Sequence, residues 1–362
     1  LRGSAAAGLT MHLAFPAWRR GMFKATGGPI TEALRRGHQV HLIHGPAGKP
    51  GEAVTVAELG ARWPDAVIHQ GPAGSHGRRL GLECADAVLV PSLHAYAMPK
   101  GPRYALDLAW ENVSLPAGLR MHYCWASEHQ RRVWVHAQSG PASYLNLPSG
   151  ETITGSPMMD AFDRPPEVTL RPQIVLLALK FPGDSGAWRR FVYRWLGYRR
   201  LVRTLRRLCA HLGAELVVKT RAKNGDPAWL ARAADRVVTD TALWPYSAAE
   251  VIRSAALIVH FQSGAALEAA FAGVPQLSVR LPQPHLRREP GHREQYEASP
   301  GMQQWPGVVP SLGWETAPGY LDTLHAPPAV DPFARAAYVA RFLEFDDCRT
   351  SARILDLVEQ GR

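Results

Sequence analysis

The feature that most restricts the fold of this chain is the pattern at residues 257–279, which read LIVHFQSGAALEAAFAGVPQLSV. An apolar run ends in Gln-Ser-Gly, an alanine-rich helix follows, and Gly-Val-Pro leads into a second apolar run. Two buried strands that are joined by one helix lie parallel, because the helix carries the chain back over a face of the sheet. The pattern therefore predicts a parallel sheet that is covered by helices.

The second half of the chain repeats this alternation. Apolar runs at 174–180, 215–220 and 235–240 predict further strands, and helix-length segments separate them. This order is typical of a doubly wound α/β unit. The first half is less regular, with a turn and short helix expected at 27–38 and strands expected at 11–17, 39–45, 65–70, 86–92, 120–126 and 132–137.

The length of 362 residues exceeds what one hydrophobic core serves, so we expect two domains. Prolines without apolar periodicity fall just after residue 162, which disfavours a helix or a central strand there. We therefore predict an N-terminal domain at 11–162, a linker at 163–173 and a C-terminal domain at 174–330. Apolar residues at three- and four-residue spacing predict closing helices in 331–362.

The net charge of +10 favours an anionic partner, such as a nucleotide, a phospholipid surface or a nucleic acid. We do not expect nucleic acid, because the sequence has no zinc-finger spacing, basic heptad region or RNA-binding signature. The four cysteines have no paired spacing, which predicts neither disulfides nor zinc and suits a cytoplasmic protein. No apolar run approaches the ~20 residues that cross a bilayer. The opening LRGSAAAGLT reads either as an addition before Met11 or as the native start.

The turn at residues 262–264 has the composition of an anion site. The free N–H groups at the start of a helix face the crevice at the carboxyl edge of a parallel sheet. Gly264 lets a ligand approach the backbone, Ser263 can cap the helix or donate to a phosphate, and Gln262 offers an amide. Glu268 lies one turn further on, where a carboxylate can accept from ribose hydroxyls. The alternative is an ordinary Ser-capped turn.

These residues resemble those of a known family. The segment HFQSGAALEAAFAGVPQLSVR (260–280) is similar to the nucleotide-binding segment of two-Rossmann (GT-B) glycosyltransferases and of their relatives, the UDP-N-acetylglucosamine 2-epimerases. ITGSPMMDAF (153–162) resembles the segment that ends the N-terminal domain of the epimerases. The resemblance implies an α/β fold with two Rossmann-like domains that face each other across a cleft.

The resemblance also implies roles. The C-terminal domain would bind a nucleotide sugar, with Ser263 and Gly264 at the diphosphate and Glu268 at the ribose, and the N-terminal domain would receive the acceptor. Ala265 and Ala269 stand where the epimerases have a second Gly and a second Glu, which disfavours epimerisation. Arg280 matches an epimerase arginine, so that reaction stays an alternative, as does a binding protein of this shape without catalysis.

Other cations follow predicted strands of the second half. Lys180, Lys219 and Arg221 are placed where the ends of parallel strands converge, so they can neutralise a leaving diphosphate. The alternative for each is a solvated loop charge. Because no Asp-x-Asp motif is present, we expect no metal, and no cofactor besides the nucleotide-sugar substrate.

Glycosyl transfer needs a base that takes the proton of the acceptor hydroxyl. His94 and Glu128 follow predicted strands of the first half and are the candidates, with a surface position as the alternative for each. Residues 18–28, WRRGMFKATGG, read as a loop after the first strand. Relatives place the wall of the acceptor cleft there, so Gly27 and Gly28 are the acceptor-side candidates.

The segment 188–212 predicts a long amphipathic helix with one apolar and aromatic face and many arginines. The plain interpretation is a helix that packs on the sheet with its arginines in water. The alternative is a surface that meets an anionic membrane or polysaccharide. The hypothesis at this stage is a metal-independent glycosyltransferase of cell-envelope polysaccharide synthesis, cytoplasmic or peripheral on the inner membrane face, with a glycan or lipid-linked acceptor.

Overall fold

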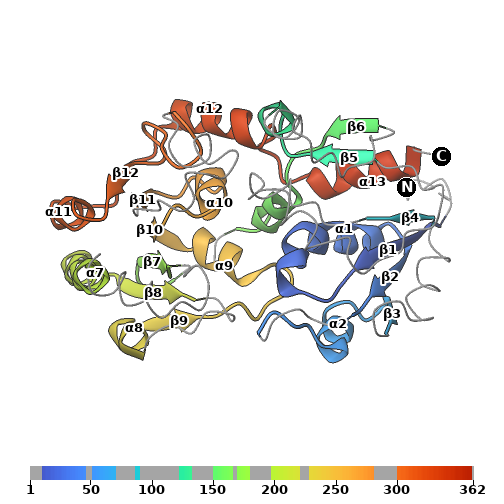
Figure 1. Cartoon of the computed structure of the whole chain (residues 1–362), viewed down its shortest axis with the longest axis horizontal. Coiled ribbons are helices and arrows are strands. Elements are labelled where there is room, and N and C mark those ends of the chain that lie inside the picture. Colours follow the sequence, from blue (N-terminus) through green and yellow to red (C-terminus); the bar gives the residue numbers. More distant parts are fainter. Residues whose placement is uncertain are drawn as a thin grey trace, which may run out of the picture.

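The computed structural model describes residues 10–45, 51–70, 86–89, 122–132, 150–165, 169–179, 197–220, 228–280 and 300–360. These residues form a four-stranded sheet, a six-stranded sheet and a pair of strands, all parallel and accompanied by helices (Figure 1). The predicted α/β class is confirmed. The domain boundaries stay a prediction.

The first sheet has the strand order β3-β2-β1-β4. Its apolar residues alternate, so that Leu13, Phe15, Val40 and Leu42 are buried in one core with residues of the helices. The strands are β1 (His12–Pro16), β2 (Gln39–Ile43), β3 (Val67–His69) and β4 (Ala87–Val88), and the helices are η1 (Arg20–Met22), α1 (Phe23–Arg35) and α2 (Val56–Arg62).

The second sheet has the strand order β12-β11-β10-β7-β8-β9. Its strands are β7 (Gln173–Leu177), β8 (Glu215–Lys219), β9 (Arg236–Val238), β10 (Ala255–His260), β11 (Gln276–Arg280) and β12 (Ser311–Gly313). The chain reverses direction across the sheet between β7 and β10, which is the place where doubly wound folds bind their ligands.

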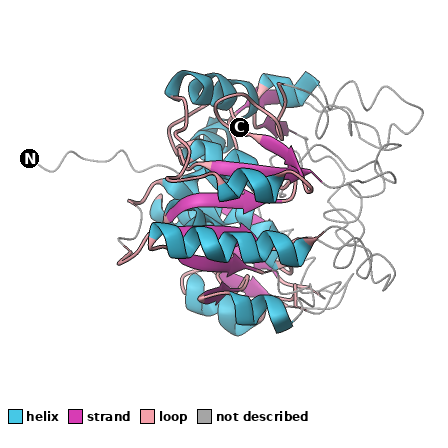
Figure 2. Cartoon of the chain, turned by 90° about the vertical axis from the view of Figure 1, so that its left-hand side faces the viewer, coloured by secondary structure: helices cyan, strands magenta, loops and turns pink. Residues whose placement is uncertain are grey.

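Helices lie on both faces of this second sheet (Figure 2). Residues on one face, such as Ile174 and Val259, share a core with α7, and those on the other face, such as Val175 and Ile258, share a core with α9 and α10. The helices are α7 (Tyr198–Leu212), α8 (Ala228–Ala233), α9 (Ser247–Arg253), α10 (Ala265–Phe271) and α11 (Ala317–Asp322). The two covered faces explain the continuous apolar runs of the strands.

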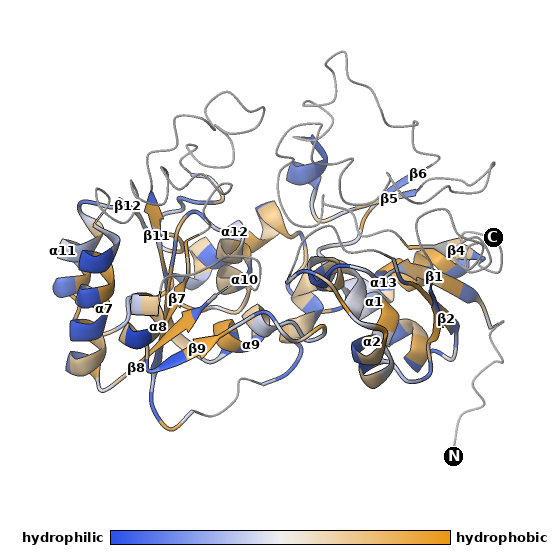
Figure 3. Ribbon diagram, turned by 60° about the horizontal axis from the view of Figure 1, so that its bottom comes forward, coloured by the Kyte–Doolittle hydropathy of each residue, from blue (hydrophilic) through white to orange (hydrophobic). Residues whose placement is uncertain are grey.

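The sequence predicts one long helix over residues 188–212, but the arginine-rich helix α7 begins only at Tyr198. Gly197 has a φ of 63°, a left-handed conformation that precedes the first helical residue, and residues 188–196 lie outside the described residues. Tyr198, Val202 and Leu205 are buried against the sheet, as expected. Figure 3 shows α7 apolar toward the sheet and hydrophilic on its outer side. The amphipathic packing is confirmed.

Several short elements were not predicted. Among them are β6 (Gly150–Ile153), β12 and the 3-10 helix η3 (Pro157–Phe162). The strand β5 (His122–Trp125), which pairs with β6, was predicted. A three- or four-residue strand is too short to show a period of two. The strand expected at 132–137 is wrong at its start, because residues 128–132 are helical, and 133–137 lie outside the described residues.

Two closing helices, α12 (Pro332–Phe342) and α13 (Thr350–Gln360), confirm the prediction for the tail. They run along one side of the molecule, with α12 against α10 and α13 against α1 (Figure 1). The carboxylate of Asp160 accepts the backbone N–H groups of Thr350 and Ser351 at 3.0 and 2.6 Å, so it caps α13 from the end of the first half.

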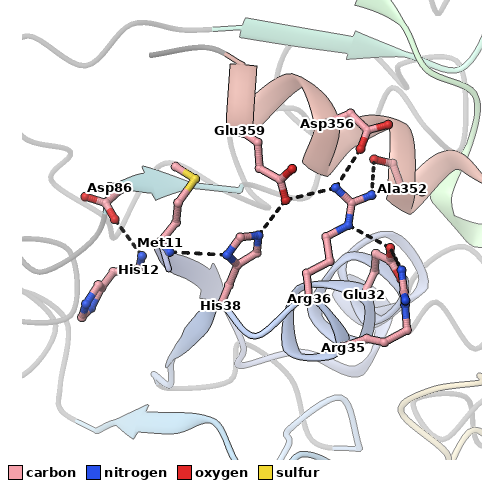
Figure 4. A network of polar contacts seen from close by, with 10 residues as sticks. All are labelled: Met11, His12, Glu32, Arg35, Arg36, His38, Asp86, Ala352, Asp356 and Glu359. Atoms are coloured by element: carbon pink, nitrogen blue, oxygen red, sulfur yellow. Dashed lines mark hydrogen bonds and ion pairs between the residues drawn. The ribbon is translucent and has the colours of Figure 1, made fainter. Parts of the chain in front are cut away.

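The other end of α13 is held by charges (Figure 4). The Arg36 guanidinium of α1 contacts Glu32, Asp356 and Glu359 at 2.7–3.0 Å, and the ring of His38 contacts Glu359 at 2.8 Å. The C-terminal helix is therefore attached to the first half, although it follows the second half in sequence. None of the helices in the described part of the chain is long and apolar enough to cross a membrane.

Candidate functional site

The candidate site is the turn that follows β10, at the switch point of the second sheet. Gln262 has a φ of 44°, an uncommon left-handed value for a residue other than glycine. Gly264 is the N-cap of α10, and Ser263 Oγ accepts the N–H of Ala265 at 3.3 Å. The predicted N-cap is therefore one residue off. Residues 262–264 are partly exposed, so their polar groups are accessible to a ligand.

A set of buried side chains holds this turn. Nδ1 of His260 accepts the Ser263 N–H at 3.3 Å, and Nε2 of His260 lies 2.9 Å from Oε1 of Gln276. The Gln276 amide donates to the Ala266 carbonyl at 3.1 Å, and the Gln303 amide donates to the Ser263 carbonyl at 2.8 Å. The turn and the start of α10 are thus fixed by side chains from three separate segments.

His260 is neutral in this environment. Its ring is completely buried, and burial lowers its pKa to about 4. With Nδ1 accepting, the ring proton is on Nε2 and is donated to Gln276. Sequence reasoning missed His260, Gln276 and Gln303, although a histidine at the end of an apolar strand and a glutamine at the start of the next one were visible signals.

Glu268 lies in α10 with only 2 % of its surface exposed, and its Oε1 accepts no hydrogen bond from the described residues. Among the described residues, Lys24 of α1 forms an ion pair with this carboxylate, with its Nζ 3.6 Å from Oε1. The Lys24 ammonium also lies 4.6 Å from the centre of the Tyr246 ring. A buried acceptor without a full partner is costly, so this carboxylate is free to take a donor from a ligand.

Lys24 is the residue of the site that the sequence concealed most completely. It belongs to the first half and is brought to Glu268 by the packing of α1. No motif in residues 18–28 distinguishes it from neighbouring charges. The ribose role of Glu268 itself stays a prediction.

Lys219 is at the end of β8, as predicted, but its charge is already matched. The ammonium is 5 % exposed, contacts Asp240 Oδ1 at 2.6 Å and donates to the Thr220 carbonyl at 2.5 Å. A diphosphate would compete with Asp240 for it, so its assignment to the leaving group stays a prediction. Lys180 and Arg221 lie outside the described residues.

Gly27 and Gly28 correct the expected loop, because both lie inside α1. A Cβ on Gly27 would come within 2.7 Å of the Trp244 ring, and a Cβ on Gly28 within 2.5 Å of Ser351 Oγ. The two glycines therefore make room for Trp244 and α13. The local sequence Gly-Gly-Pro disfavours a helix, and this tertiary packing overrides that preference. Their acceptor-side role stays a prediction.

Of the two candidate bases, only Glu128 lies among the described residues. Glu128 contacts Arg131 and Arg132 at 2.8 and 2.9 Å, and these hydrogen bonds lower its pKa to about 2. A carboxylate that is ionised so firmly accepts a proton poorly at neutral pH, which argues against Glu128 as the base in this conformation. His94 lies outside the described residues. Within the described ranges, no three His, Cys, Asp or Glu side chains are grouped to hold a metal ion.

The fold matches solved structures of low sequence identity. A UDP-N-acetylglucosamine 2-epimerase from Listeria monocytogenes is 13% identical with a TM-score of 0.54, and 98% of this chain and 97% of that chain are aligned. The wall teichoic acid polymerase TagF is 11% identical, with a TM-score of 0.55 over 97% and 89% of the two chains. MnaA of S. aureus, solved with UDP, is 12% identical, with a TM-score of 0.52 over 97% of both.

No family model matches the sequence, and no curated protein sequence matches it significantly. The structural matches confirm the expected fold, which is that of GT-B glycosyltransferases and the related epimerases.

Proposed function

We propose that this protein transfers a sugar from a nucleotide-activated donor to a glycan or lipid-linked acceptor. The observation that carries the proposal is the buried carboxylate of Glu268 beside the turn at the switch point, because its Oε1 accepts no hydrogen bond from the part of the chain that the structure describes. A pair of ribose hydroxyls supplies the donors that such a carboxylate needs. Support comes also from one structural neighbour that is named a UDP-N-acetylglucosamine 2-epimerase and from another that was solved with UDP.

The geometry suggests how the donor is held. The diphosphate is bound by the partly exposed backbone of Ser263 and Gly264, whose position is fixed by His260 and Gln303. Because these groups are fixed before the ligand arrives, they stabilise the departing diphosphate without reorganising. Lys24 reaches this site from the first half of the chain. We therefore expect its ammonium to contact the nucleotide when the ribose hydroxyls bind Glu268. The reaction is a direct displacement, and His94 is the base to be tested.

Nucleotide binding is the first test. Melting temperatures measured with UDP, CMP, GDP and their sugars should rise for one base only, because a ligand that binds the folded state stabilises it. Glu268→Ala should weaken that nucleotide by about 1–2 kcal/mol, the contribution of a charge-assisted hydrogen bond. Glu250→Ala, an exposed carboxylate on α9, is the matched control and should bind normally.

Two further variants separate the parts of the site. Gly264→Val should obstruct the diphosphate and abolish turnover while the protein stays folded. Lys24→Met should preserve the fold and change nucleotide affinity less than Glu268→Ala does, because Lys24 is partly exposed. The absence of any nucleotide-dependent melting shift, or unchanged affinity in folded Glu268→Ala, would refute the proposed site.

A nucleotide-sugar 2-epimerase is the second candidate, because epimerases are among the structural neighbours with TM-scores above 0.5. The two reactions differ in their need for an acceptor. An epimerase interconverts the C2 epimers of its nucleotide sugar alone, whereas a transferase releases nucleoside diphosphate only when an acceptor is added. Nucleotide binding with neither reaction would identify a binding protein without catalysis.

A membrane-bound acceptor is the finer part of the proposal and concerns α7. Arg200 and Arg203 are exposed on its outer face, whereas Arg206 and Arg207 are paired with Asp235 and Asp322. Unpaired basic residues near an anionic membrane contribute about 1 kcal/mol each. Arg200 and Arg203 are therefore the residues that we expect to contact lipid.

Sedimentation with phosphatidylserine vesicles tests this surface. Changing Arg200 and Arg203 to Glu should weaken binding by roughly 30-fold, and binding should fall as salt rises from 0.1 to 1 M. The control variant changes Arg35 and Arg132 to Glu, since these exposed first-half residues give the same change in net charge. If the wild-type protein does not sediment with such vesicles at low salt, the outer face of α7 contacts only water.

A further inference from the structure

Three histidines form a continuous chain across the first sheet. Nδ1 of His12 in β1 lies 3.0 Å from Nε2 of His41 in β2, and Nδ1 of His41 lies 2.9 Å from Nε2 of His69 in β3. The strands are neighbours and parallel, with His41 opposite Ala14 and His69 opposite Ile43, so all three rings are on the same face. His41 is 4 % exposed, and His12 and His69 are partly exposed.

The rings meet edge to edge. The centroids of His12 and His41 are 5.2 Å apart and the ring planes differ by 17°, while those of His41 and His69 are 5.1 Å apart at 31°. In both pairs the facing nitrogens are much closer than the centroids, so each contact joins one ring edge to the next. These are the distances of N–H···N hydrogen bonds. Each pair of facing nitrogens makes its own contact, and within the described residues the three rings do not form a group that could hold a metal ion.

Proton counting restricts what such a chain can do. A neutral imidazole carries one proton, and each of the two contacts needs one. Two arrangements satisfy both contacts: every ring protonated on Nε2, or every ring protonated on Nδ1. One extra proton is also accommodated, because a cationic His41 donates to both neighbours. A second extra proton places two N–H groups face to face and breaks a contact.

We propose that His12, His41 and His69 are a proton relay that connects the carboxyl edge of the first sheet, where the strands end, to its amino edge, where they begin. A proton that binds Nδ1 of His69 moves the Nε2 proton of His69 to Nδ1 of His41, and the Nε2 proton of His41 to Nδ1 of His12. The Nε2 proton of His12 is released to solvent, so one proton enters and one leaves. All three rings then carry their proton on Nδ1, and the reverse transfer resets them.

The positions of the rings give the relay a direction. His69 is the last residue of β3 and His12 is the first residue of β1, so the chain runs from the carboxyl edge of the parallel sheet to its amino edge. The carboxyl edge is where α/β sheets bind ligands. The relay is independent of the function proposed above, because it depends only on the contacts between these rings.

The described surroundings favour the neutral forms of His41 and His69. Burial lowers the pKa of His41, and the neighbouring rings lower it further; burial also lowers the pKa of His69. The titratable groups nearby on the described elements are already engaged. Asp86 before β4 accepts the backbone N–H of His12, His44 after β2 contacts the Val54 carbonyl, and His38 on the other side of Met11 contacts Glu359.

Nuclear magnetic resonance of protein labelled with ¹⁵N-histidine tests the relay without any ligand. Scalar coupling between the ring nitrogens of His12 and His41, and of His41 and His69, should be detectable, because a hydrogen bond transmits it. The three rings should also show the same tautomer in their ¹⁵N chemical shifts, because only the arrangements with every proton on Nε2 or every proton on Nδ1 satisfy both contacts. The exposed pair His211 and His325, whose facing nitrogens are 3.4 Å apart and whose rings are tilted by 64°, is the internal control and should show no coupling of this size.

Substitution then tests whether His41 connects the ends. His69→Gln should change the tautomer ratio of His12 when His41 is present, but it should have no effect when His41 is Leu, because a leucine side chain makes no hydrogen bond to either ring. If His41→Leu does not fold, the wild-type couplings decide alone. Absent nitrogen–nitrogen coupling, or a His12 tautomer ratio that is the same with and without His69, would overturn the relay.

Discussion

The two sheets share a strand order, since β3-β2-β1-β4 corresponds to β9-β8-β7-β10. They differ in the hydrogen-bond partners of their buried histidines. In the second sheet, His260 is bound on both ring nitrogens by groups that do not titrate near neutral pH. In the first sheet, His41 is bound on both ring nitrogens by two other histidines, each of which can hold its proton on either nitrogen. The same strand order therefore contains a histidine with fixed hydrogen bonds in the second half and a chain of histidines that we propose to exchange protons in the first half.

The two halves also contribute differently to the candidate site. The second half supplies a turn that is fixed by its own buried side chains. The first half supplies the side chain of Lys24, which is positioned by a helix with two glycines against Trp244. The comparison indicates that the ligand-binding turn is rigid by construction, whereas the opposing cation depends on how the two halves pack.

Removing the fixed support should have the largest effect on stability. His260→Leu leaves the Oε1 of the buried Gln276 and the N–H of the partly exposed Ser263 without these partners. We expect the free energy of unfolding, measured by urea denaturation, to fall by about 3 kcal/mol. His211→Leu, at an exposed histidine, is the control and should change it by less than about 0.5 kcal/mol. Equal effects of the two variants would show that the support is unimportant.

The pH dependence sharpens the same contrast. Because the pKa of His260 is about 4 in the folded protein and 6.5 ordinarily, its stabilising contribution is complete above pH 6.5 and is lost as the pH falls toward 4. The difference in unfolding free energy between wild type and His260→Leu should therefore shrink by about 2 kcal/mol between pH 7 and pH 5. A difference that stays constant over this range would contradict the neutral, buried state of the ring.

The first half should respond more weakly to a change in its packing. Gly27→Ala places a Cβ against the Trp244 ring, and overpacking costs typically 1–3 kcal/mol, which the better helix propensity of alanine offsets in part. We expect the free energy of unfolding to fall by about 1 kcal/mol. In the Gly27→Ala background, Lys24→Met should also change nucleotide affinity less than it does in the wild type. Gly21→Ala, where a Cβ has no neighbour within 4 Å, is the control. A stabilised Gly27→Ala would mean that the halves can separate at this contact without cost.

Much of the second half was predictable, because its strands are buried on both faces and its helices have one apolar face. The turn at Ser263 and Gly264 was found for the same reason, since it interrupts two strongly apolar runs. The first half was less predictable because short strands carry too few residues to establish a period, as β6 shows. The α1 helix was mistaken for a loop at Gly27 and Gly28, because the space that favours glycine there is created by Trp244, more than 200 positions away.

The sequence alone determined the α/β class, the parallel order of the second half, the closing helices and the position of the turn, because these depend on patterns within about twenty neighbouring residues. The tertiary structure decided which charges meet. It pairs Lys219 with Asp240, brings Lys24 to Glu268, and aligns His12, His41 and His69 across three strands. Such contacts depend on the register between strands and on how distant segments pack, and neither is expressed in the local order of residues.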